Sequence, residues 1–182
     1  MASPGEVIGF WQEVGPAKWF AHDPALDAAI RAQFEGLHHA SARGELNGWM
    51  DSWEGSLALL LLHDQFPRNL FRGSAHAWAT DPLAKCLAGR ALDAGHDAMA
   101  TAALRVYYYL PFEHSEDLTD QDRCLALCAA LDAASGSTFA NWASLHRDII
   151  VRFGRFPHRN AALGRVTTPE EQAFLDDGGF AG

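Results

Sequence analysis

The chain of 182 residues is poor in lysine and has no long apolar run. Its only lysines are Lys18 and Lys85, and its net charge is −9. It therefore lacks the clustered positive charge by which proteins bind nucleic acids or adhere to anionic membranes. The longest apolar run, Leu57 to Leu62, is much too short to span a bilayer. These absences predict a protein with no nucleic-acid partner and no membrane partner.

Cysteine is also scarce. Cys86, Cys124 and Cys128 are too few, and odd in number, for a disulfide framework, which suits a reducing compartment. Cys124 and Cys128 lie one helical turn apart among leucines, so they are expected in the core rather than on a metal. The N-terminus has no basic segment followed by an apolar one, so no secretory signal is expected. We predict a cytoplasmic protein with no cofactor and no metal.

Strand-like alternation of apolar and polar residues is missing, whereas helical spacing recurs along nearly the whole chain. Asp23 and Asp81 are predicted helix caps, and Thr119 with Asp122 predicts a capping box. The length and the 48% hydrophobic content fit a single all-α domain over residues 1–182. Helices are predicted over residues 7–13, 24–43, 52–65, 81–94, 98–109, 119–133 and 138–153, with a last short helix from Thr168.

One phrase occurs twice. Residues 57–73 are LALLLLHDQFPRNLFRG, and residues 145–165 are LHRDIIVRFGRFPHRNAALGR. Each has an apolar helix, a Phe-Pro pair expected to stop that helix, and a turn rich in Arg and Asn. The repeat indicates either two related helical halves or a chance recurrence of Phe-Pro after a helix.

So much fixed positive charge on apolar helices predicts an internal polar cleft. Guanidinium groups match carboxylate or phosphate, so the leading hypothesis is a small anionic ligand. Nearby carboxylates are about as numerous as the arginines, so an internally paired, purely structural network is an alternative. The candidate ligand-binding residues are Asp64, Gln65, Arg68, Asn69, Arg72, Glu116, His146, Arg155, Arg159 and Asn160.

Two histidines, His114 and His158, are the candidate catalytic residues. Arg155 and Arg159 would depress the pKa of His158 and leave a neutral imidazole, which can act as a general base. Helix capping explains the polar residues 115–117 but not His114. A metal held by Glu113, His114, Glu116 and Asp117 is disfavoured because nearby arginines would repel a cation. A hydrolase with Ser115 as its nucleophile is disfavoured because no Gly-x-Ser-x-Gly elbow is present. The sequence leaves open whether the chain is an enzyme.

Four segments together resemble the bacterial family known as domain of unknown function 924. They are FWQEVGPAKWFAHDPALDAAI, LLLLHDQFPRNLFRG, YYLPFEHSEDL and HRDIIVRFGRFPHRNAALGRVTTPEEQAFL. The resemblance implies a tetratricopeptide-like all-α fold and no established activity. We therefore expect about seven to nine helices in stacked antiparallel pairs, with both Phe-Pro turns and residues 113–117 lining one cleft.

That fold analogy also supports a second hypothesis, a module that binds a peptide or protein without catalysis. The aromatic N-terminal segment, residues 10–20, is expected either in the core or at a homodimer contact, and the oligomeric state stays open.

Overall fold

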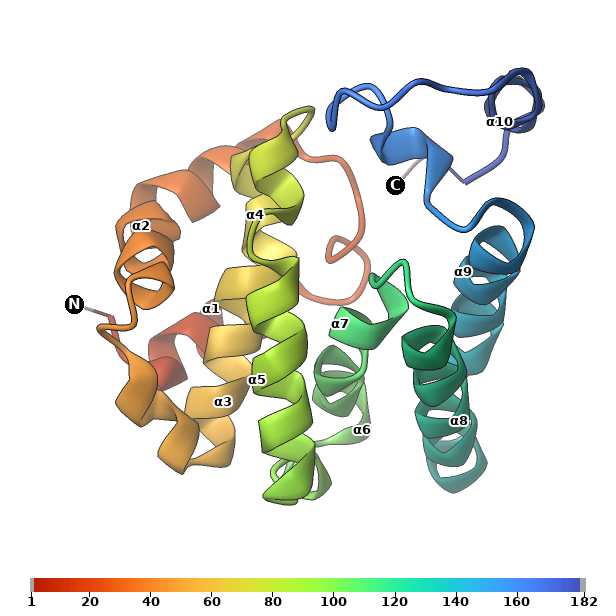
Figure 1. Cartoon of the computed structure of the whole chain (residues 1–182). Helices are drawn as coiled ribbons and strands as arrows, with labels where there is room; N and C mark the ends of the chain where they lie inside the picture. Colours follow the sequence, from red (N-terminus) through yellow and green to blue (C-terminus); the bar gives the residue numbers. More distant parts are fainter. Residues whose placement is uncertain (1, 181–182) are drawn as a thin grey trace. The chain divides into compact units, whose positions relative to one another are not determined.

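The computed structural model describes residues 2–180, and within them every regular element is helical (Figure 1). The all-α prediction is therefore confirmed. The chain forms two compact units, which are described separately. Unit 1 runs through Arg72 and continues over His76–Pro111; unit 2 comprises Gly73–Ala75 and the chain from Phe112. The predictions of one domain over residues 1–182 and of tetratricopeptide-like stacking stay predictions.

Unit 1 is organised around α3 (Trp53–Leu60), which contacts α1 (Pro4–Val14) and α5 (Asp81–Asp93). All residues from Gly55 to Leu60 are buried, as the nearly all-apolar composition of this helix predicts. Trp11 of α1 is fully buried against Phe66 and Tyr107, so part of the aromatic N-terminal segment belongs to the core. The other α-helices of the unit are α2 (Pro24–Ala42), α4 (Phe66–Leu70) and α6 (Ala102–Arg105).

Unit 2 contains an antiparallel pair, α8 (Leu118–Ser135) and α9 (Phe139–Phe153), which lie side by side in Figure 1. The turn between them begins at Gly136, which has a φ of +73° that only glycine adopts readily. Asp132 then accepts the backbone N–H groups of Phe139 and Ala140 at 2.9 and 2.8 Å, which fixes where α9 begins.

The remaining elements are short. α7 (Leu110–Glu113) precedes α8, and α10 (Pro169–Asp176) follows α9. 3₁₀ turns cover Asn47–Asp51, Ala75–Trp78, Asp97–Met99, Val106–Tyr108 and Pro157–Arg159, and a π-helical turn covers Leu61–Gln65.

Several predicted helix ends are confirmed and others are wrong. Asp23 caps α2, and Thr168 caps α10 through a complete capping box with Glu171. The capping box predicted at Thr119 is wrong, because the Asp117 carboxylate accepts the Thr119 N–H and starts α8 earlier. The single helix predicted over residues 98–109 is also wrong, since α6 gives way to a 3₁₀ turn after four residues.

Candidate functional site

In the first phrase the Phe-Pro pair does not stop the helix, contrary to the prediction. The path runs from α3 through the π-helical turn into α4, with Pro67 near the start of α4. The Phe66 N–H bonds to the Leu61 carbonyl, one residue further back than in an α-helix. The Leu62 carbonyl thereby loses the Phe66 N–H that an α-helix would supply, and the His63 carbonyl has no donor from Pro67, which lacks an N–H.

Side chains from distant segments occupy those two carbonyls. His38 of α2 donates its Nδ1–H to the Leu62 carbonyl at 2.8 Å. The Thr80 hydroxyl donates to the His63 carbonyl at 2.7 Å. Both contacts are at least partly buried, and a buried carbonyl without a donor is costly. Two polar residues that sequence reasoning missed therefore hold the irregular helix together, and only the missing N–H of Pro67 signals the need for them.

His63 lies in the same turn and pairs with Ser41 of α2. Its Nε2 is 2.7 Å from the Ser41 Oγ, and both residues are buried. Burial, with a smaller contribution from His38, lowers the pKa of His63 to about 4, so the imidazole is neutral. This resembles a nucleophile–base pair, but within residues 2–180 no group hydrogen-bonds the other ring nitrogen to orient it.

Asp64 and Arg68, two predicted ligand-binding residues, belong to an internal ion-pair network of unit 1. Arg68 donates hydrogen bonds to both carboxylate oxygens of Asp81, at 2.5 and 2.9 Å, and to the Ala77 carbonyl. It also approaches Asp64 at 3.5 Å, while Gln65 donates to the other oxygen of Asp64 at 2.5 Å. The prediction that Asp81 caps this helix is wrong, because Asp81 is the first residue of α5 and Thr80 occupies the cap position.

Asn69 and Arg72 of the first phrase share one carboxylate, Asp27 of α2. The Asn69 amide donates to it at 2.7 Å, and Arg72 donates through Nε and Nη2 at 3.2 and 3.1 Å. Together these contacts tie the end of α4 to α2.

In unit 2 the second phrase does end its helix, but at Gly154 rather than at the Phe-Pro pair. Gly154 has a left-handed φ of +68°, and its N–H caps α9 through the Ile150 carbonyl. Arg155 then forms a two-point ion pair with Glu171 at 2.6 and 2.8 Å, and the Asn160 amide reaches the same carboxylate at 3.2 Å. The Arg155 hydrogen bonds hold the pKa of Glu171 at about 2.

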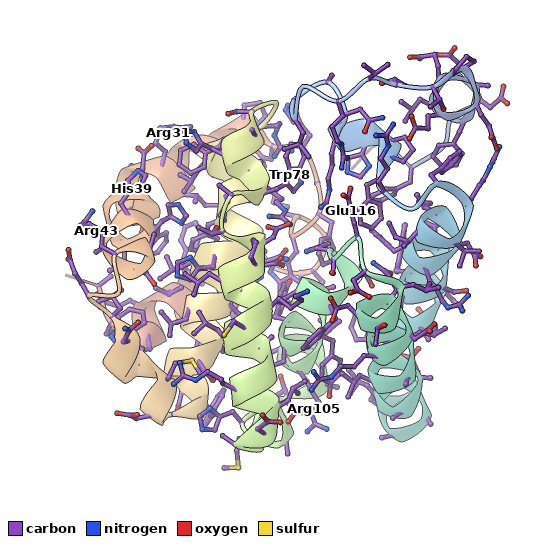
Figure 2. All side chains as sticks on the ribbon, viewed as in Figure 1. Arg31, His39, Arg43, Trp78, Arg105 and Glu116 are labelled. Atoms are coloured by element: carbon purple, nitrogen blue, oxygen red, sulfur yellow. The ribbon has the colours of Figure 1, made fainter. Side chains whose placement is uncertain are left out.

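Glu116, labelled in Figure 2, joins the segment before α8 to the turn after α9. Its carboxylate accepts the Phe156 N–H at 2.8 Å and both Nη groups of Arg165 at 2.7 and 3.0 Å. Burial alone would raise the pKa of Glu116, but the hydrogen bonds from Arg165 and Phe156 outweigh it and hold the pKa below its ordinary value.

Two of the candidate histidines of unit 2, His146 and His158, lie against the rings of Phe156 and Phe180. Burial lowers the pKa of His146 to about 4, so the imidazole is neutral. Its Nδ1 lies 3.5 Å from the Glu113 Oε1. Its Nδ1–H donates to the Trp142 carbonyl at 2.9 Å. The ring centroids of His114 and His146 are 6.3 Å apart.

Arg159 is almost fully buried in the same region. It donates to the His114 carbonyl at 3.0 Å, and its guanidinium lies 4.4 Å from the centroid of Phe156. The His158 ring lies against Phe156 and Phe180, at 5.7 and 5.3 Å between centroids. Residues 113–117 and the second Phe-Pro turn therefore contact each other directly.

The predicted site residues divide between the two units. Asp64, Gln65, Arg68, Asn69 and Arg72 lie in unit 1. His114, Glu116, His146, Arg155, His158, Arg159 and Asn160 lie in unit 2. That both sets line one cleft stays a prediction.

One apolar groove in unit 2 was missed. It encloses about 300 Å³ between α9 and the segment around α10. Trp142, Leu145, Ile149 and Phe153 recur at spacings of three and four along α9, and of these Trp142 is 59% exposed and Leu145 41%. The groove is lined by Leu145, Asp148, Ile149, Arg152, Phe153, Phe174, Gly178, Gly179 and Phe180.

Glycine at position 179 allows the chain to pass close to Phe174, and both residues line the groove. A Cβ there would lie 2.4 Å from the Phe174 carbonyl oxygen and 2.6 Å from its ring. The segment after α10 can therefore approach Phe174 this closely only with glycine at this position.

Two further properties limit the site. No three His, Cys, Asp or Glu side chains within residues 2–180 are placed to hold a metal ion. No helix in the same range combines the length and apolar character needed to cross a membrane.

The comparisons agree with this helical architecture. No curated protein matches the chain. A solved structure of a protein of unknown function from Agrobacterium tumefaciens, ATU0120, is 48% identical, with a TM-score of 0.90 over 96% of this chain and 97% of that one. The model of a family described as bacterial protein of unknown function, DUF924, matches residues 7–179. The chain belongs to this bacterial family of unknown function.

Proposed function

We propose that this chain is a binding module without catalysis, and that it takes an apolar segment of a partner protein into the groove beside α9. The observation that carries this proposal is the groove lined by Leu145, Phe153 and Phe174, with Leu145 itself 41% exposed. Trp142, 59% exposed, precedes Leu145 by about one turn of α9. Exposed aromatic side chains next to a concave apolar surface are typical of protein interaction sites.

The rival hypothesis of a small anionic ligand has less support. Three of the four arginines assigned to that anion, Arg68, Arg72 and Arg155, already hold internal carboxylates through two or more hydrogen bonds. A guanidinium bound in this way has to give up its carboxylate before it can hold another anion. The same contacts favour a structural role for the polar network.

Selection from a random peptide display library on the full chain tests the proposal. We expect selected peptides to lose affinity about tenfold or more with Trp142→Ala and with Leu145→Ala. Val151→Ala is the matched control, because Val151 is 56% exposed on the same helix, does not line the groove and stands nine residues after Trp142, on the opposite face of α9. Peptides that ignore Trp142→Ala, or that respond equally to Val151→Ala, would place the binding surface elsewhere.

A further inference from the structure

A second groove lies in unit 1, between α1 and α2, and shares no residue with the groove beside α9. It has a volume of about 450 Å³. Its aromatic lining comes from Phe10 and Phe34, whose rings meet edge to face at 5.0 Å between centroids. The groove is lined by Ala2, Glu6, Gly9, Phe10, Glu13, Gln33 and Phe34.

The charged residues of this lining are both glutamates of α1, Glu6 and Glu13. Within residues 2–180 neither glutamate forms an ion pair with a basic side chain. One carboxylate oxygen of Glu6 accepts the Ser3 N–H and hydroxyl at 2.7 and 2.8 Å, as part of the capping box of α1. The other oxygen of Glu6 and the exposed carboxylate of Glu13 are left for a ligand. The lining is therefore negatively charged and suits a cation.

The spacing of the two glutamates indicates what kind of cation can use both. They stand seven residues apart, or two helical turns, so they project from nearly the same side of α1 with Cα atoms roughly 10 Å apart at 1.5 Å per residue. No third carboxylate, histidine or cysteine of residues 2–180 joins them, so a metal ion would have few protein ligands. A ligand with one charge can pair with one glutamate and leaves the other unpaired. Two separated positive charges match the pair better.

The surface between the two glutamates is suited to a methylene chain. Gly9 and Phe10 lie midway along this stretch of α1 and line the groove. A Cβ at Gly9 would meet no atom within 4 Å, so packing does not require glycine there and the space beside the helix is empty. Glycine inside a helix lowers stability relative to alanine, but it lets a ligand approach the backbone closely.

From this lining we propose that the groove between α1 and α2 binds a linear polyamine. One terminal ammonium group lies at each glutamate, and the methylene chain between them lies against Gly9 and Phe10. Charge complementarity selects the class of ligand, and the separation of the glutamates selects its length. The side-chain carbonyl of Gln33 is an acceptor for an inner amine, such as that of spermidine. The site goes beyond the proposed function and does not depend on it.

Calorimetric titration of the full chain with three amines tests charge and length separately. Heptamethylenediamine has two ammonium groups about as far apart as the two glutamates. Putrescine has the same charge on a shorter chain, and heptylamine has the same chain with one charge. We expect heptamethylenediamine to bind about fivefold more tightly than either at low salt, roughly the effect of one further exposed ion pair. Equal affinity for the two diamines, or for heptylamine, would overturn the proposal.

Two double variants that remove equal charge test the place of binding. Glu6→Gln with Glu13→Gln should weaken heptamethylenediamine about fivefold or more, and glutamine at position 6 can still complete the capping box. Asp51→Asn with Asp93→Asn removes two exposed carboxylates of unit 1 outside the groove and should leave the affinity as it is. An equal loss in both double variants would trace the attraction to the charge of the whole chain and overturn the proposal.

Gly9→Ala separates binding from folding. Alanine meets no atom there and favours the helix, so Tm should rise, yet its methyl group enters the groove and should weaken diamine binding several-fold. Gly36→Ala is the matched control, because Gly36 lies inside α2 with equally open surroundings and does not line the groove. It should also raise Tm and should leave binding unchanged. If Gly9→Ala binds the diamine as the natural chain does, the methylene chain does not lie beside this glycine and the proposal fails.

Discussion

The two Phe-Pro turns, at Phe66-Pro67 and at Phe156-Pro157, have similar sequences but different backbone conformations. In the first, the helix continues through a π-helical turn, and side chains from α2 and from Thr80 occupy the released carbonyls. In the second, Gly154 ends the helix two residues before Phe156, and Glu116 binds the turn. The first turn therefore needs donors for its carbonyls, and the second needs an acceptor for a backbone N–H.

A single position decides between the two outcomes. When the Phe-Pro pairs are aligned, Gly154 stands where the first phrase has Asp64. Glycine adopts the left-handed conformation without cost, so α9 can end there. Asp64 stays helical and buried, and its carboxylate needs Gln65 and Arg68 as partners. Two similar sequences thus differ in which backbone groups need a side-chain partner: carbonyls in the first turn and an N–H in the second.

The largest expected difference lies in the ion pairs. The side chains of Arg68 and Arg165 are both 23% exposed, but the carboxylate of Asp64 is 1% exposed and that of Glu116 is 28% exposed. Arg68→Ala should lower the free energy of unfolding by about 3–5 kcal/mol, because it takes the guanidinium away from the buried Asp64 carboxylate. Arg165→Ala should cost about 1 kcal/mol. Urea unfolding measures both, and equal losses would show that the two turns are equally enclosed.

The pH dependence comes next, because each phrase carries one buried neutral histidine, His63 or His146. Their pKa values of about 4 in the folded chain lie below the unfolded value near 6.5, so the unfolded chain binds more protons between these limits. Stability is therefore lost as the pH falls from about 6.5 to about 4, by about 1.4 kcal/mol per pH unit for each histidine.

Unfolding in urea at a series of pH values checks this slope. His63→Gln and His146→Gln should each remove about half of the slope that this pair of histidines contributes; the buried His38, whose pKa burial also lowers, keeps its own share in both variants. The control is His39→Gln, since His39 is exposed on α2 (Figure 2). A slope that only one of the two buried histidines controls would show that the other turn opens to water before the unit unfolds.

Gly154 offers a smaller and cleaner test. Gly154→Ala should cost about 1–2 kcal/mol, because alanine is strained at a φ of +68° while its methyl group meets no atom within 4 Å. Gly89→Ala, inside α5 with equally open surroundings, should instead stabilise by about 0.5–1 kcal/mol. Thermal unfolding distinguishes the two signs. A neutral Gly154→Ala would mean that α9 can end without a left-handed residue.

Local signals in the sequence predicted much of the fold and little of the site. The caps at Asp23 and Thr168 depend on neighbours within three residues, and both were predicted. The partners of Arg68, Arg72 and Arg155 come from Asp81, Asp27 and Glu171, up to 45 residues away. Which carboxylate meets which guanidinium depends on how helices pack, and helical spacing alone does not determine that.

The smallest expected effect tests whether the first turn depends on a distant hydroxyl. Thr80→Val keeps the shape of the side chain but leaves the His63 carbonyl without its donor, which should cost about 1 kcal/mol. Thr101→Val is the matched control, since the Thr101 side chain makes no capping hydrogen bond, and its cost should stay within about 0.5 kcal/mol. Thr80→Ser keeps the hydroxyl and should retain most of the stability. If Thr80→Val costs no more than Thr101→Val while Thr80→Ser costs more, the methyl group of Thr80 matters rather than its hydrogen bond, and Pro67 is accommodated by packing alone.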